Sequence, residues 1–164
     1  MISYDRAALN SEINDLLAET EATIPREMAT DLPYMKQFPD VHEWHDFELK
    51  IWDMGEKIRQ LIFSSKATFD QGQIRRIVDI CLDKRAKRGR QSFVMLLGKV
   101  KYREQAHALI PLLEDEDVNG HVIDTLYKMR ANGYASLIAA FLTHKQTWIR
   151  NTAKKYVQKF EAAD

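Results

Sequence analysis

The stretch Phe93-Val94-Met95-Leu96-Leu97 aligns with Ile123-Asp124-Thr125-Leu126-Tyr127 and with Ala153-Lys154-Lys155-Tyr156-Val157, at a spacing of thirty residues. Apolar residues fill three columns of this alignment: Phe93, Ile123 and Ala153; Leu96, Leu126 and Tyr156; Leu97, Tyr127 and Val157. Because the columns are spaced i, i+3, i+4, each segment is predicted to form an amphipathic helix with a narrow buried stripe. A period of this length is typical of a helical repeat array, so the sequence predicts an all-α fold.

Size and composition are those of an ordinary soluble domain. The 164 residues fit one domain, and 45% of them are hydrophobic. No apolar run approaches the roughly 18 residues of a membrane span. The only cysteine, Cys81, lies in an apolar run and is expected to be buried. A single cysteine and the lack of an apolar leader favour a cytoplasmic location.

The net charge of zero is divided unevenly along the chain. Residues 1–56 carry thirteen Asp and Glu against four Lys and Arg, so residues 57–164 carry the balancing positive charge. Opposite fields at two ends would steer two partners or favour head-to-tail pairing. Ordinary solvation of helix faces explains the same pattern.

The N-terminal part is predicted to hold three helices. The first covers residues 3–23 with Ser3 or Asp5 as its cap, and the third starts at Asp70 and runs through Leu82. The second is expected to begin at Asp40, which forms a capping-box pattern with Glu43, and to be the packing centre of this part.

Between the first two helices the periodicity stops. Three of the four prolines lie within residues 23–40, so this connection is expected to be irregular. The apolar side chains expected to fasten it to the body are Tyr34, Met35 and Phe38.

Shorter helices are predicted in the remainder, at about 89–101, 104–114, 118–131, 133–143 and 147–161. Asp117 and Thr147 are the predicted N-caps, and Asn132-Gly133 is predicted to take left-handed backbone angles. Pro111 lies inside an apolar run and is expected to mark a kink or a late helix start.

Two runs resemble a HEAT repeat: residues 89–100, which end in Leu97-Gly98-Lys99-Val100, and residues 108–117, which hold Ile110-Pro111-Leu112-Leu113 before an acidic turn. The resemblance covers roughly residues 72–160. Arg90 and Arg150 match the family's arginine position, with Asp115 or Asp117 as the acidic partner, whereas Gly120 replaces the arginine of the middle unit.

This resemblance implies a short right-handed α-α superhelix of HEAT-like helical pairs with an acidic N-terminal helical cap. Residues 1–164 would form one domain, with acidic N-terminal helices in 1–66 and repeats in 70–161. It also implies that the second helix of each pair lines an inner surface. The inner columns would be Gln91, His121, Asn151; Val94, Asp124, Lys154; Met95, Thr125, Lys155; with Lys128 and Gln158 beyond. Plain solvation of helix faces accounts for these polar positions equally well.

The densest charge is a basic run. Eight lysines and arginines and no acid lie between Lys84 and Arg103. Such a patch favours an acidic protein surface or nucleic-acid phosphates. Its aromatic residues are Phe93 and Tyr102, and Phe93 belongs to a core column, so there is little to stack against single-stranded bases.

Metal and catalytic signals are weak. His42, His45 and Asp46 stand at i, i+3, i+4 beside Glu43 and Glu48, but no second cluster supplies further ligands. The sequence contains no nucleophile elbow, phosphate-binding glycine loop or Cys-His pairing. We therefore expect no metal, no cofactor, no small-molecule substrate and no enzymatic activity.

The favoured interpretation is a non-catalytic protein-protein interaction module, acting as an adaptor or as an inhibitor of the immunity type. Its partner is expected to be another protein, and not a membrane. The alternative is binding of nucleic-acid phosphates through the basic patch at 84–103. The candidate partner-binding residues are Lys84, Arg85, Lys87, Arg88, Arg90, His121, Asp124, Thr125, Lys128, Asn151, Lys154 and Lys155.

Overall fold

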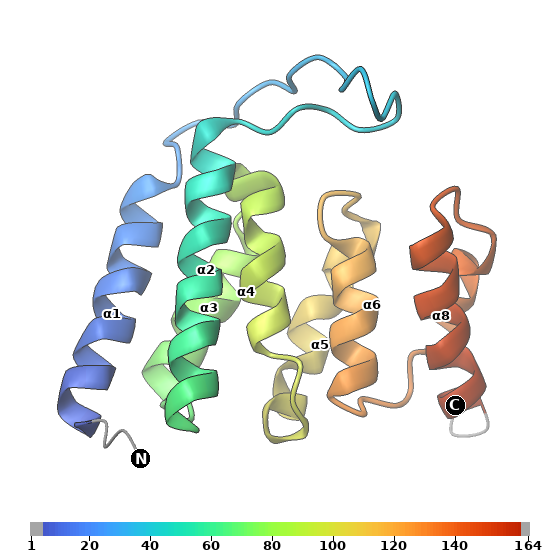
Figure 1. Ribbon diagram of the computed structural model, residues 1–164. Helices are drawn as coiled ribbons and strands as arrows, with labels where there is room; N and C mark the ends of the chain where they lie inside the picture. Colours follow the sequence, from blue (N-terminus) through green and yellow to red (C-terminus); the bar gives the residue numbers. More distant parts are fainter. Residues whose placement is uncertain (1–4, 162–164) are drawn as a thin grey trace. The chain divides into compact units, whose positions relative to one another are not determined.

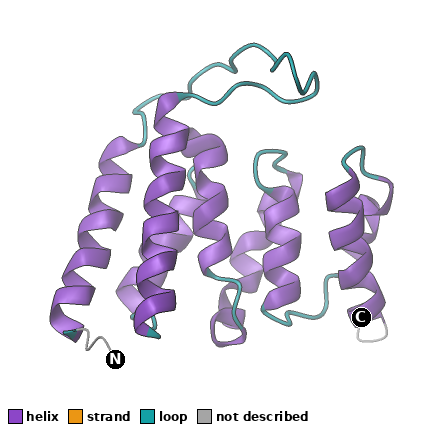
Figure 2. Ribbon diagram, in the orientation of Figure 1, coloured by secondary structure: helices purple, strands orange, loops and turns teal. Residues whose placement is uncertain are grey.

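The computed structural model describes residues 5–161, and the regular secondary structure in that range is helical (Figures 1 and 2). The predicted all-α class is therefore confirmed. Contacts divide the chain into two compact units, Met1–Phe93 and Val94–Asp164. Within the described range, no helix combines the length and the apolar character that crossing a membrane requires.

The first unit contains α1 (Arg6–Thr23), α2 (Asp46–Ser65), α3 (Gln71–Leu82) and the 3₁₀ helix η1 (Lys84–Gly89). Asp5 caps α1 by accepting the Ala7 N–H at 3.0 Å, whereas the other predicted cap, Ser3, lies outside the described residues. Helix α3 begins as predicted, because the side chains of Asp70 and Gln73 each accept the other's backbone N–H.

The predicted start of α2 at Asp40 is wrong. The chain there forms a small hairpin, in which Met35 N–H donates to the Val41 carbonyl at 2.7 Å and Glu43 N–H to the Pro33 carbonyl at 2.9 Å. Helix α2 begins only at Asp46, where Glu48 accepts the His45 N–H at 2.8 Å. Residues 24–45, here called the long loop, therefore connect α1 to α2 (Figure 2).

Helix α2 is the packing centre of this unit, as predicted, because it contacts α1 and η1 and buries a wide apolar face. The core combines Leu9, Ile13 and Leu17 of α1 with Ile51, Met54, Ile58 and Ile62 of α2 and Ile74, Ile77 and Cys81 of α3. Burial of side chains of this size is the main force that holds the three helices together.

The second unit is built mostly from shorter helices than the sequence predicts, although α8 (Thr147–Phe160) matches the predicted 147–161. Helix α4 (Arg90–Leu96) enters it from the first unit and ends well before residue 101. There follow η2 (Val100–Gln105), α5 (Ala106–Leu109), η3 (Ile110–Glu114), α6 (Asn119–Lys128), α7 (Ala135–Ile138), η4 (Ala139–Thr143) and α8 (Thr147–Phe160). Pro111 lies at the start of η3, so the predicted interruption at this proline is confirmed.

Two predicted helix caps are wrong. Val118 precedes α6 and Gln146 precedes α8, so neither Asp117 nor Thr147 is an N-cap. The Thr147 hydroxyl instead accepts a hydrogen bond from Arg150 at 2.8 Å. The predicted left-handed glycine is confirmed, since Gly133 has φ 96°.

Two of the three aligned apolar columns lie in the core, whereas Tyr127 and Val157 of the third column are half-buried. Leu126 and Tyr156 are fully buried and Leu96 nearly so. Helices α6 and α8 lie side by side and run in the same direction (Figure 1): Gly120 faces Trp148 near their starts, and the rings of Tyr127 and Phe160 meet near their ends. These contacts of the second unit therefore join residues that are separated by roughly the thirty-residue spacing of the aligned segments.

Gly120 sets the distance between α6 and α8, because a Cβ there would lie 2.3 Å from Trp148 and 2.8 Å from Ile149. We predict that Gly120→Ala lowers the free energy of unfolding by about 1–3 kcal/mol, since the methyl group must displace both side chains. Gly72→Ala is the control, because its Cβ would meet only the Asp70 carboxylate, at 3.3 Å; its effect should stay below about 1 kcal/mol. Chemical denaturation measures both, and an unchanged stability of Gly120→Ala would contradict this close approach.

Candidate functional site

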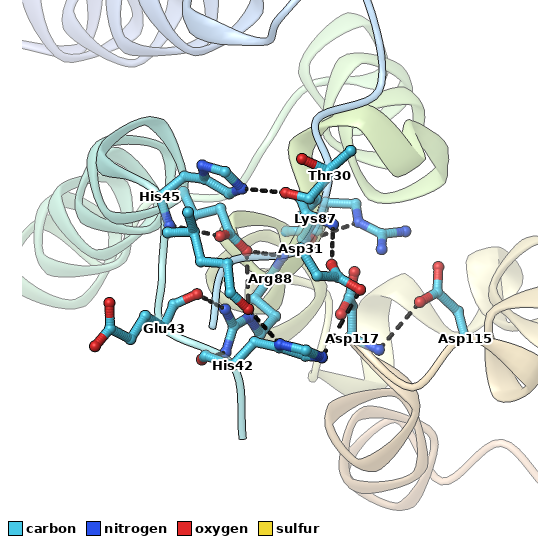
Figure 3. A network of polar contacts seen from close by, with 12 residues as sticks. Thr30, Asp31, His42, Glu43, His45, Lys87, Arg88, Asp115 and Asp117 are labelled. Carbon is cyan, nitrogen blue, oxygen red and sulfur yellow. Dashed lines mark hydrogen bonds and ion pairs between the residues drawn. The ribbon is translucent and has the colours of Figure 1, made fainter. Parts of the chain in front are cut away.

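The first part of the basic run that the sequence singles out forms η1, and three of the four cations of η1 bond within the first unit (Figure 3). Arg85 pairs with Asp83 at 2.6 Å, and this hydrogen-bonded pair lowers the pKa of Asp83. The Arg85 guanidinium also donates to the Arg26 carbonyl of the long loop at 3.1 Å. Lys84 remains exposed.

Lys87 is buried although it is charged. Its ammonium donates to Asp31 of the long loop at 2.7 Å, and this hydrogen bond holds the pKa of Asp31 below its ordinary value. The backbone of Lys87 has φ 48° and ψ −133°, a conformation that non-glycine residues adopt at a cost of about 1–3 kcal/mol. The surrounding contacts therefore hold Lys87 against its own backbone preference.

Arg88 makes the most extensive contacts of the run. Its backbone N–H and its Nε both donate to the buried carboxylate of Glu48, at 3.0 and 3.2 Å. Its two terminal nitrogens donate to the carbonyls of His42 and Glu43, each at 2.6 Å, and its guanidinium lies 4.8 Å from the Trp44 ring centroid. Arg88 therefore joins η1, the start of α2 and the end of the long loop.

Arg90 has a structural position as well. It is fully buried, and its Nε donates to the Lys87 carbonyl at 2.7 Å. A guanidinium in this position does not reach an external partner, so the prediction that Arg90 contacts one does not fit the structure.

The two histidines of the weak metal pattern close the long loop on itself. A ring N–H of His42 donates to the Leu32 carbonyl, and one of His45 donates to the Thr30 carbonyl at 2.8 Å. Within residues 5–161 no group of three potential ligands is arranged around a metal position. These imidazoles, together with Arg85, Lys87 and Arg88, are called the clasp below.

The clasp holds a loop in which three large apolar side chains stay in water, whereas Met35 is half-buried. Met28 is 54% exposed, Tyr34 58% and Phe38 60%. The prediction that Tyr34 and Phe38 fasten the loop to the body is therefore wrong. Tyr34 does stack on His42 with ring centroids 4.0 Å apart, which stiffens the hairpin without covering the tyrosine.

In the second unit, the remaining candidate residues lie on α6 and α8. Asn151, Lys154 and Lys155 are exposed on α8. Asp124 of α6 pairs with Lys128 at 2.8 Å, and His121 is half-buried against Trp148 with ring centroids 5.1 Å apart. Burial lowers the pKa of His121, so its ring is neutral at pH 7. These six residues, His121, Asp124, Lys128, Asn151, Lys154 and Lys155, form what is called the α6–α8 face.

Two members of the predicted inner columns are not on the surface. Thr125 is buried, and its hydroxyl donates to the carbonyl of Val94, which is buried too. A hydroxyl on the apolar stripe of α6 is satisfied by this backbone carbonyl instead of by water. Thr125 therefore cannot contact a partner, contrary to the prediction.

Sequence reasoning selected the residues of the α6–α8 face as candidates and did not single out the long loop. The available signal was its length, since connections of this size without regular structure are uncommon in compact domains and are frequently functional. Comparison of the chain with protein-family models, curated protein sequences and solved structures finds no match.

Cys81 is not an accessible nucleophile. Its side chain is fully buried, and this burial raises the pKa of the thiol to about 12. The expected burial is confirmed, and a thiol in this state stays protonated and unreactive at neutral pH.

The Cys81 thiol should make stability depend on pH. In the unfolded chain a cysteine ionises near pH 8.5, whereas the folded thiol keeps its proton to about pH 12. Ionisation therefore favours the unfolded state as the pH rises above roughly 8.5, by up to about 1.4 kcal/mol per pH unit. We predict that the stability difference between the parent and Cys81→Ala shrinks between about pH 8 and about pH 10 in denaturant titrations. A difference that stays constant across this range would contradict the buried, protonated thiol.

Proposed function

We propose that this protein is a non-catalytic protein-binding module, an adaptor or an inhibitor of the immunity type, that contacts its partner through the α6–α8 face. The observation that carries the proposal is the state of Lys154 and Lys155. Both are exposed, and no described residue forms an ion pair with either of them. Exposed cations on a regular helix are positioned to meet an acidic protein surface.

The framework beneath this face supports the proposal. Helix α8 buries Ile149, Ala153 and Tyr156 and packs closely on α6 at Gly120. The α6–α8 face is therefore held on two packed helices, which reduces the entropy lost when a partner binds.

We further propose that the second unit is part of a short right-handed stack of HEAT-like pairs. Support comes from the parallel direction of α6 and α8 and from the hydrogen bond of Thr125 to Val94, 31 positions earlier. In such arrays, equivalent helices of successive repeats lie side by side and form an extended binding surface.

A non-catalytic role agrees with the state of several reactive side chains. The Cys81 thiol is buried and protonated, and the His42 and His45 rings bond to loop carbonyls. The nucleic-acid alternative has lost most of its basis at η1, because Arg85, Lys87 and Arg88 bond to acids and carbonyls of their own unit. Arg85 is exposed although it pairs with Asp83, and the other exposed cations of the run are Lys84, Lys99, Lys101 and Arg103.

We predict that the double substitution Lys154→Glu, Lys155→Glu weakens capture of the partner at least about 10-fold, because it reverses two cations that steer and hold an acidic surface. The matched control is Lys50→Glu, Arg75→Glu, which changes the charge equally at exposed positions of the first unit. Tagged proteins are compared by quantitative affinity capture from native cells, at low and high salt.

Equal capture by both double variants, or no dominant captured protein, would overturn the proposal. Retention on a DNA or RNA column that is lost in Lys99→Glu, Lys101→Glu would instead support phosphate binding, with a steep salt dependence. Loss of the partner's own activity on binding would identify an inhibitor rather than an adaptor.

A further inference from the structure

The long loop combines extensive anchoring with apolar exposure. Its backbone or side chains receive hydrogen bonds at Arg26, Thr30 and Asp31, and again at His42 and Glu43. Large apolar side chains left in water by a segment that is held in place mark an interaction site. Ordering a loop costs conformational entropy, and a loop that leaves its apolar side chains in water recovers little of that cost through burial.

We propose that the hairpin at residues 33–43 is a preorganised aromatic finger that inserts Phe38 into an apolar pocket of a protein partner, with Tyr34 of the same hairpin as a second aromatic contact. The inference rests on the proposed protein-binding function and adds a second contact to it. A buried aromatic side chain in a pocket is the usual centre of a protein interface and carries most of its binding energy.

The hairpin is stiff for reasons that can be named. Pro33 and Pro39 each fix one backbone angle, and two backbone hydrogen bonds, one on each side, close the pairing of Tyr34 with His42. Since Arg88 bonds to the carbonyls of His42 and Glu43, the returning strand is attached to η1. A finger ordered before binding loses less entropy when it enters a pocket.

Charge favours a protein pocket over a lipid surface. The long loop carries Arg26 and Lys36 against four acids, Glu27, Asp31, Asp40 and Glu43. Loops and helices that attach to anionic membranes carry an excess of cations beside their apolar residues. The acidic excess predicts an apolar pocket with a basic rim.

Site-specific photo-crosslinking tests the finger while its partner is still unidentified. The photoreactive residue p-benzoylphenylalanine replaces Phe38 in the full chain, and, as a control, Leu137 of α7, which is exposed to a similar extent. We predict one discrete protein adduct from position 38 that the control position does not form. Absence of an adduct above the control, or a lipid adduct identified by mass, would overturn the inference.

Once the adduct has identified the partner, the affinity of each variant for the purified partner gives the quantitative test. Phe38→Ser should weaken binding about 30-fold, as loss of an interface hot spot does, whereas Leu137→Ser should change it less than about 2-fold. Asp31→Ala removes the acceptor of Lys87 without altering the tip, and it should weaken binding about 5-fold through lost preorganisation.

The outcomes separate the two proposals. Equal affinity of Phe38→Ser and the parent would overturn the finger, even if Lys154→Glu, Lys155→Glu abolishes binding and so upholds the α6–α8 face. Loss of binding in Phe38→Ser with none in the lysine variant would uphold the finger and overturn that face. Circular dichroism of each variant checks that its helices are retained.

Discussion

The carboxylate of Glu48 is the interaction on which the first unit depends. It is fully buried and accepts the N–H of His45 at the start of α2, together with the backbone N–H and Nε of Arg88. Through Arg88 it is linked to the carbonyls of His42 and Glu43 at the end of the long loop. A buried charge that lost these partners would cost several kcal/mol. The hydrogen bonds of Glu48 and Arg88 therefore fix the start of α2, the path of η1 and the end of the long loop together. Gly89 permits this close approach, because a Cβ there would lie 2.9 Å from the Glu48 carbonyl.

The cations of η1 and those of α8 differ in their partners. Three of the four cations of η1 meet Asp31, Glu48 and Asp83 inside their own unit, so they organise the fold. Lys154 and Lys155 of α8 form no ion pair with an acid among residues 5–161, and the proposed partner contact is based on their charge. The clasp also orders the long loop while it leaves Tyr34 and Phe38 exposed. Rigid support with exposed aromatic and cationic groups is the combination that protein recognition requires.

Local signals in the sequence were sufficient for several elements and not for others. The α3 capping box and the apolar columns depend on neighbours within one or two helical turns, so Asp70, Leu126 and Tyr156 are placed as the pattern predicts. The acidic pattern at Asp40 predicted an early start of α2, whereas the hairpin pairing of residues 33–43 delays the start to Asp46. The basic run was interpreted as a surface because its acids are distant in sequence: Asp31 lies 56 positions from Lys87, and Glu48 lies 40 positions from Arg88. Charge density alone does not reveal such partners.

Amide hydrogen exchange in the parent and in Glu48→Gln tests most directly whether η1 holds the long loop. The amides of Met35 and Glu43, which bond to the Val41 and Pro33 carbonyls, should be protected in the parent. In Glu48→Gln the charged acceptor of Arg88 is lost, so these amides should exchange at least about 10-fold faster while those of α8 keep their protection. Loop amides that exchange in the parent at the rate of an unstructured peptide, or that keep their full protection in Glu48→Gln, would contradict this account.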